Sequence, residues 1–171
     1  MGQVARTTSQ RPGLRWGLLV LVGLAACSSP GPQAPRLPGS SHPGNRPEAA
    51  RAAARAAVSL IGVPYRYGGA APSGFDCSGL VIYSYARAGV PGLPHSVASL
   101  ERIARPVALE DLQPGDLLFF RLSGKKTSHV AIYVGERTFV HAPSGGKRVE
   151  RVSFDHVYWG PRVRRAGRLA L

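Results

Sequence analysis

The spacing of hydrophobic and polar positions changes along the chain from a helical period to a strand period. An alanine-rich segment after Asn45, with Glu48 three residues further on and Gly62 as a stop signal, predicts a helix of about 14 residues. Apolar positions in "CSGLVIYSYARAG" predict a second helix over 77–88, and "HSVASLERIA" (95–104) predicts a shorter third one. The first half of the domain is therefore expected to be helical.

A different pattern follows "LQPGD", a turn built on Pro114 and Gly115. β-Branched and aromatic residues form short runs, separated by glycine-containing turns: "LLFFR", "HVAIYV", "TFVHA" and "KRVERV". Residues 63–74, with repeated Pro and Gly, are expected to form a loop. Helices followed by strands predict an α+β domain, with N-terminal helices packed on a C-terminal antiparallel β-sheet.

The N-terminus carries an apolar stretch preceded by three arginines. Residues 16–26 are apolar over about 11 positions, which is too short for the roughly 20 that span a bilayer. Residues 1–26 are therefore interpreted as a signal peptide. Removing the three arginines of this segment leaves a net charge of +10 from the +13 of the whole chain.

The signal peptide ends in "LAAC", which resembles the lipobox of bacterial lipoproteins. The resemblance implies cleavage before Cys27 and diacylation of its thiol, and two acyl chains anchor a protein stably to a membrane. Ser28 in place of an aspartate indicates sorting to the outer membrane, facing the periplasm. The alternative is an ordinary signal peptide cleaved after Ala26.

The segment after the signal peptide is dense in Pro, Gly and Ser. Residues 27–46 have no hydrophobic periodicity and are expected to form a linker, with the folded domain over 47–171. The export signal and the lack of a basic-aromatic stripe argue against nucleic acid as a partner. The positive charge is explained equally by a coding bias or by attraction to an acidic wall or membrane surface.

Cys77 is the only thiol left if Cys27 is lipidated, so an intramolecular disulfide is excluded. Its place at the start of a predicted helix favours a thiolate, because unsatisfied N–H groups and the helix dipole stabilise negative charge. The same position also suits a small buried structural residue. Cys77 is a candidate nucleophile if a histidine lies within reach.

Two histidines occupy neighbouring predicted strands. His129 is expected to share a strand face with Ala131 and Tyr133, and an odd-length turn places His141 on that face as well. A two-residue Glu136-Arg137 turn would place the histidines on opposite faces. On one face, they provide a base and its orienting partner. A zinc site made of two histidines and one cysteine is the alternative.

Four separated segments in order, "GVPYRYGGAAPSGFDCSGLV", "LQPGDLLFF", "SHVAIYVG" and "FVHAPS", resemble the NlpC-type cell-wall cysteine peptidases, a papain-like family. The pattern is most similar to the lipoprotein murein endopeptidases of Gram-negative bacteria. The resemblance implies a peptidoglycan endopeptidase that needs no cofactor or metal. It assigns roles to six residues: Cys77 as nucleophile, His129 as base, His141 as orienting residue, and Tyr65, Asp76 and Ser78 as oxyanion-stabilising or substrate-binding groups.

One segment departs from the family pattern. In "LPHSVASL", His95 and Ser96 stand where the family usually has an arginine followed by small hydroxyl residues, and His95 is expected to cap or pack. A carboxylate next to a nucleophile disfavours the thiolate, so Asp76 is expected to point away from Cys77. Rival hypotheses are a non-catalytic wall-binding lipoprotein and an enzyme acting on a lipid or small amide. A regulatory adaptor or protease is left open.

Overall fold

The computed structural model describes residues 46–171, apart from 123 and 125. The expected signal peptide, the lipidation site at Cys27, most of the linker and the Asn45 cap lie outside the described residues. Within the described part of the chain, none of the helices has both the length and the apolar character needed to span a membrane.

Three α-helices precede most of the strands, as expected. The helices are α1 (Arg46–Ser59), α2 (Cys77–Arg87) and α3 (Val97–Ile103), with 3-10 helices η1 (Leu109–Asp111) and η2 (Gly160–Arg162). The strands are β1 (Ala70–Ala71), β2 (Gly74–Phe75), β3 (Ala104–Val107), β4 (Leu117–Phe120), β5 (His129–Gly135), β6 (Thr138–His141), β7 (Glu150–Ser153) and β8 (Val163–Leu169). These elements confirm the α+β class.

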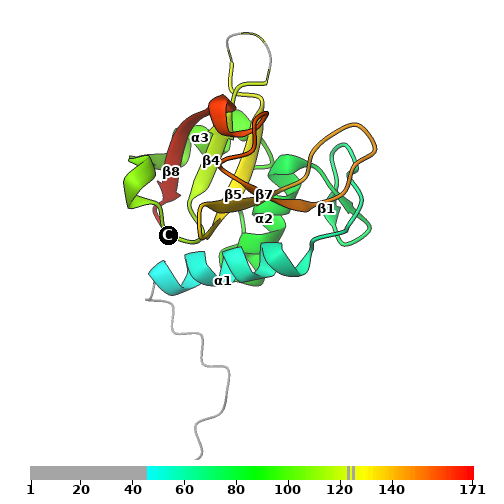
Figure 1. Ribbon diagram of the computed structural model, residues 1–171. Helices are drawn as coiled ribbons and strands as arrows, with labels where there is room; N and C mark the ends of the chain where they lie inside the picture. The colour runs from blue at the N-terminus through cyan, green and yellow to red at the C-terminus, as the bar shows by residue number, and fades with distance from the viewer. Residues whose placement is uncertain (1–45, 123, 125) are drawn as a thin grey trace, which may run out of the picture. The chain divides into compact units, whose positions relative to one another are not determined.

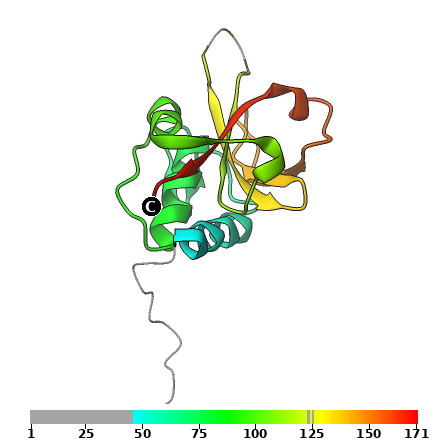
Figure 2. The same cartoon turned by 90° about the vertical axis from the view of Figure 1, so that its left-hand side faces the viewer.

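The strands form a six-stranded antiparallel sheet in the order β3-β8-β4-β5-β6-β7, and β1 and β2 form a separate ribbon. Figures 1 and 2 show α1 and α2 side by side, where they pack against each other and against β5. Two strands of the sheet were not predicted, because β3 contains a proline and β8 carries three arginines. The ribbon β1-β2 lies in the segment expected to be loop.

The core has two parts, one on each face of the sheet. One face of the central strands packs against the helices, through Val130 and Ile132 of β5 and Leu80 and Val81 of α2. The other face forms a second cluster with Ala131. All four residues of β4 are buried, because this strand is covered on both faces.

Small residues let α1 lie close to the turn before β4. The buried positions of α1 are Ala53, Ala54 and Ala57, which follow one helical face. Gly115 has a φ of +103°, and a Cβ there would collide with the carbonyl group of Ala50. Glycine is required at this position for both reasons.

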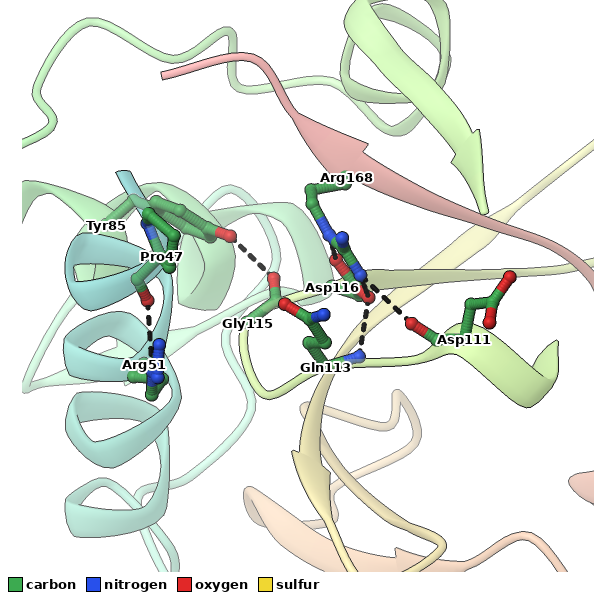
Figure 3. Close-up of polar contacts among 8 residues, drawn as sticks. All are labelled: Pro47, Arg51, Tyr85, Asp111, Gln113, Gly115, Asp116 and Arg168. Atoms are coloured by element: carbon green, nitrogen blue, oxygen red, sulfur yellow. Dashed lines mark hydrogen bonds and ion pairs between the residues drawn. The ribbon is translucent and has the colours of Figure 1, made fainter. Parts of the chain in front are cut away.

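An ion pair behind this turn ties β4 to β8 (Figure 3). Asp116 is 1% exposed, and its carboxylate accepts hydrogen bonds from Arg168 Nε at 2.7 Å and Nη2 at 2.8 Å. The backbone N–H of Gln113 donates to the same carboxylate at 2.8 Å, and the Tyr85 hydroxyl donates to the Gly115 carbonyl. The "LQPGD" turn is therefore held by polar contacts on both sides.

Candidate active site

Cys77 is the first residue of α2. Asp76 is the N-cap, with extended backbone, and its carboxylate accepts from the Gly79 N–H at 2.6 Å. Gly79 has no room for a side chain, because a Cβ there would collide with the carbonyl oxygen of Gly69. The start of α2 is thus pressed against the loop before β1, and this close approach fixes the position of the thiol.

The surroundings of Cys77 favour its protonated thiol. Burial raises the pKa of Cys77 above its ordinary value, and the charge of Asp76 acts in the same direction. Hydrogen bonds from the backbone N–H groups of Val130, Ser78 and Cys77 itself lower the pKa but do not outweigh burial. The helix start alone therefore does not produce a thiolate, in contrast to the expectation from the sequence.

Asp76 is surrounded by donors. Its carboxylate accepts from the Gly68 N–H at 3.0 Å and from the Ser78 hydroxyl at 3.0 Å, and His95 Nε2 lies 3.0 Å from Oδ1. Burial alone would raise the pKa of Asp76, but the hydrogen bonds from Gly79, His95 and Ser78 lower it overall. The carboxylate faces these groups, as its position beside a nucleophile led us to expect.

Ser78 and His95 take their places around this carboxylate. The Ser78 hydroxyl donates a hydrogen bond to Asp76, and the residue is only 6% exposed, so it holds the carboxylate from its buried side. The cap of α3 is Ser96, whose hydroxyl accepts from the Ser99 N–H. His95 does not cap the helix; its imidazole packs against Asp76.

The two histidines meet on one face of the sheet. His129 Nε2 lies 2.9 Å from His141 Nδ1, and both rings are buried, at 4% and 0% exposure. The turn between their strands has two residues in the left-handed region, Glu136 and Arg137, with φ of 51° and 53°. By itself this turn would separate the histidines onto opposite faces.

A β-bulge reverses that outcome. The register of β5 against β6 pairs Tyr133 with Phe139 but Gly135 with Thr138, so one extra residue stands in β5. Because of this extra residue, the side chains of β5 before the bulge point to the opposite face from the one the turn alone would give. His129 therefore lies on the same face as His141. The sequence left open whether the histidines share a face, and the combination of a two-residue turn with a bulge was not among the expectations.

Trp159 covers the histidine pair. Its ring centroid lies 4.3 Å from that of His141 and 5.2 Å from that of His129, and its side chain is buried. Burial lowers the pKa of His129 to about 4. Burial, followed by the charges of His129, Lys147 and His156, lowers that of His141 to about 2. Both imidazoles are therefore neutral at physiological pH.

Sequence reasoning missed Glu150, the first residue of β7. It stands directly opposite His141 in the β6-β7 register, and its Oε1 lies 3.2 Å from His141 Nε2. The predicted strand around "KRVERV" contains Glu150, but no local signal gives the register that brings it to a histidine.

Tyr65 lies beside Cys77. Its backbone N–H donates to the Lys147 carbonyl at 2.9 Å and the residue bridges to Phe75, just before the α2 cap. Burial raises the pKa of Tyr65, and the neighbouring charges of Cys77 and Asp76 act in the same direction. The phenol is thus close enough to both groups for negative charge on them to raise its pKa.

The structure therefore brings the six predicted site residues into two adjoining groups. Tyr65, Asp76 and Ser78 gather at the start of α2 with Cys77, and His129 and His141 pair on the sheet. Val130, whose N–H reaches the Cys77 sulfur, directly follows His129 and links the groups. Across residues 46–171 without 123 and 125, no set of three or more His, Cys, Asp or Glu side chains is placed to hold a metal ion.

A cysteine at a helix start, beside a histidine pair on an antiparallel sheet, defines a papain-like α+β domain. The sequence profile of the NlpC/P60 family matches residues 62–168, and the chain belongs to that family. The match takes in every predicted site residue of the domain.

Three curated relatives illustrate the similarity. The chain is 47% identical over 104 residues to the probable endopeptidase Rv2190c of Mycobacterium tuberculosis, covering 61% of this chain and 26% of that protein. It is 37% identical to the murein DD-endopeptidase MepH of Escherichia coli, covering 70% and 45%, and 41% identical to the probable endopeptidase NlpC of the same species, covering 59% and 66%. The chain thus spans about a quarter of the length of the mycobacterial relative.

Solved structures agree in fold. An NlpC/P60 family protein from Bacillus cereus matches with a TM-score of 0.66 and 28% identity, covering 71% of this chain and 40% of that one. The NlpC/p60 domain of the peptidoglycan hydrolase SagA matches with a TM-score of 0.61 and 32% identity, covering 70% and 98%.

Proposed function

We propose that this protein is a peptidoglycan endopeptidase that cleaves amide bonds of stem peptides or cross-links with Cys77 as nucleophile. The observation that carries the proposal is the placement of Cys77 at the start of α2, next to the strand that presents the hydrogen-bonded pair His129 and His141. Relatives named as a murein DD-endopeptidase, from Escherichia coli, and as a probable peptidoglycan endopeptidase, from Bacillus subtilis, support the same substrate class.

In the proposed mechanism the resting thiol and imidazole are both neutral. The proton of Cys77 passes to His129 as the sulfur attacks the amide carbonyl, and the new negative charge falls on the carbonyl oxygen. The Cys77 N–H and the Tyr65 hydroxyl are the donors proposed for that oxygen. His129 then returns the proton to the leaving amine, and water releases the acyl group from the sulfur.

Asp76 is proposed to bind a positively charged group of the substrate. Its carboxylate is held ionised by the surrounding donors, and the hydrogen bond from the Ser78 hydroxyl fixes its orientation. A free ammonium is present on peptidoglycan stems and absent from a lipid tail. The acidic group beside the nucleophile therefore favours a peptide stem over a lipid substrate.

We also propose that Cys27 carries the lipid anchor and that the domain works in the periplasm, attached to the outer membrane. The anchor is tested by expressing the full chain with Cys27→Ala. We expect the unchanged protein to sediment with membranes and the variant to move to the soluble periplasmic fraction. A variant that sediments as before would contradict the lipid anchor.

The activity is tested by incubating purified peptidoglycan with the full-length protein and with Cys77→Ser, and by measuring the released fragments by mass spectrometry. We expect fragments from the unchanged protein alone, and their masses name the bond that is cut. If neither protein releases fragments while both sediment with the wall, the non-catalytic wall-binding alternative is correct.

A further inference from the structure

Glu150 extends the histidine pair to a third polar group. Its side chain is 44% exposed and reaches His141 Nε2 from the neighbouring strand at 3.2 Å. On its other side, His141 Nδ1 meets His129 Nε2 at 2.9 Å. A continuous row of contacts therefore runs from a solvent-accessible carboxylate to the buried ring of His129.

The row has only one consistent arrangement of protons. A carboxylate accepts hydrogen bonds and cannot donate, so the proton of His141 must be on Nε2. A neutral imidazole has one N–H, which leaves His141 Nδ1 bare and able only to accept. His129 must then carry its own proton on Nε2, and its Nδ1 is bare.

The surroundings of His129 and His141 keep both imidazole rings neutral. Burial lowers the pKa of both histidines, and Lys147 and His156 further oppose a positive charge on His141. The contact between Glu150 and His141 is therefore a hydrogen bond from a neutral ring to a carboxylate, and not an ion pair. Without an acceptor at this place, either nitrogen of His141 could carry the proton.

We propose that Glu150 is a positioning residue that sets the tautomers of His141 and His129, so that the bare Nδ1 of His129 is available as the base for Cys77. The role of His129 as base for Cys77 rests on the proposed function. The tautomers of the two histidines do not depend on it and can be measured in the protein alone.

The proton balance of the step is simple. The Cys77 S–H bond breaks, its proton forms a bond to His129 Nδ1, and the sulfur lone pair attacks the carbonyl carbon. His129 is then positively charged and keeps its Nε2–H bond to His141 Nδ1, while the Glu150 carboxylate remains ionised at the far end. The same proton leaves Nδ1 for the amine of the departing peptide.

Three substitutions separate the possibilities. Glu150→Gln keeps an oxygen that can accept, Glu150→Ala removes the partner, and Glu150→Lys supplies a group that can only donate. A lysine favours the proton of His141 on Nδ1, which then donates to His129 Nε2 and forces the His129 proton onto Nδ1. The matched control is Glu110→Lys, the same charge change on an exposed residue of η1.

The full-length variants are compared by turnover on peptidoglycan and by ring-nitrogen NMR, which distinguishes a bare from a protonated nitrogen in each histidine. Circular dichroism identifies any variant that fails to fold. We expect turnover to fall about 10- to 100-fold in Glu150→Ala, as for loss of a hydrogen bond to a charged group. We expect a fall of about 100-fold or more in Glu150→Lys with little change in KM, and the least effect in Glu150→Gln.

Two results would overturn the proposal: His129 Nδ1 staying bare in folded Glu150→Lys, or turnover of that variant matching Glu110→Lys. Failure of the proposed function looks different. In that case the tautomers invert in Glu150→Lys, but neither the unchanged protein nor any variant cuts peptidoglycan. Glu150 then sets the tautomers, and the hydrolase assignment is wrong.

Discussion

His95 Nε2 contacts both carboxylate oxygens of Asp76, at 3.0 Å from Oδ1 and 3.1 Å from Oδ2. The family pattern has an arginine at this position, so a single imidazole N–H replaces a two-pronged donor. The contact joins the start of α3 to the cap of α2. If Asp76 binds substrate as proposed, the residue at position 95 affects that binding.

We predict that His95→Ala raises KM about 2- to 10-fold, the effect of one lost hydrogen bond, with little change in turnover. The pKa of Asp76 is lowered in part by His95, so its loss raises that pKa. The acid limb of kcat/KM then moves to higher pH. His95→Arg serves as the rescue variant and should restore KM, and an unchanged KM and acid limb in His95→Ala would refute a role for this contact.

The protonation state of Cys77 has a direct chemical readout. Because burial raises its pKa, the thiolate fraction at neutral pH is below that of an ordinary thiol. We predict that iodoacetamide alkylates Cys77 more slowly in the folded protein than in the urea-unfolded chain, with the rate rising as the pH rises. The Cys27→Ser background leaves Cys77 as the only thiol. Faster alkylation of the folded form at neutral pH would instead indicate a preformed thiolate–imidazolium pair.

The buried histidines make stability depend on pH. Their pKa values in the folded state, about 4 for His129 and about 2 for His141, lie below the ordinary 6.5. The unfolded chain therefore binds more protons once the pH falls below about 6.5, and stability that is fully present above this pH is lost on acidification.

We expect the free energy of unfolding, measured in urea, to fall by a few kcal/mol between about pH 7 and about pH 5. His141→Gln should reduce this loss, because it removes one of the two groups responsible. Glu110→Gln, a change at an exposed residue of η1, is the control and should leave the loss unchanged. Equal pH dependence in all three proteins would contradict this origin.

The pair of Asp116 and Arg168 is expected to matter for folding (Figure 3). Replacing Arg168 with methionine leaves a buried carboxylate with the Gln113 N–H but without its counter-charge. We predict a loss of about 3 kcal/mol in the free energy of unfolding. Arg164→Met, at an exposed position of the same strand, should change it by less than about 0.5 kcal/mol. Similar losses in the two variants would show that the ion pair contributes little.

Local sequence signals determine much of the fold. The alanine-rich segment gives α1, Gly62 has a positive φ in the turn that follows this helix, and the "DCSGL" segment places Cys77 at the first position of α2. These features depend on neighbours within a few residues, and such interactions can be recognised in a linear pattern. The edge strand β3 and its neighbour β8 could not, because the proline of β3 and the three arginines of β8 give no strand signal and pairing alone defines both strands.

The sequence by itself determined which residues can do the chemistry: one thiol in the domain, two histidines on neighbouring strands, and an acid next to the thiol. Tertiary structure decided how these groups are arranged and what surrounds them. Burial outweighs the helix start at Cys77, a bulge brings His129 and His141 to one face, and the β6-β7 register adds Glu150. Solvent exclusion and strand register arise from contacts between residues distant in the chain, so no local pattern specifies them.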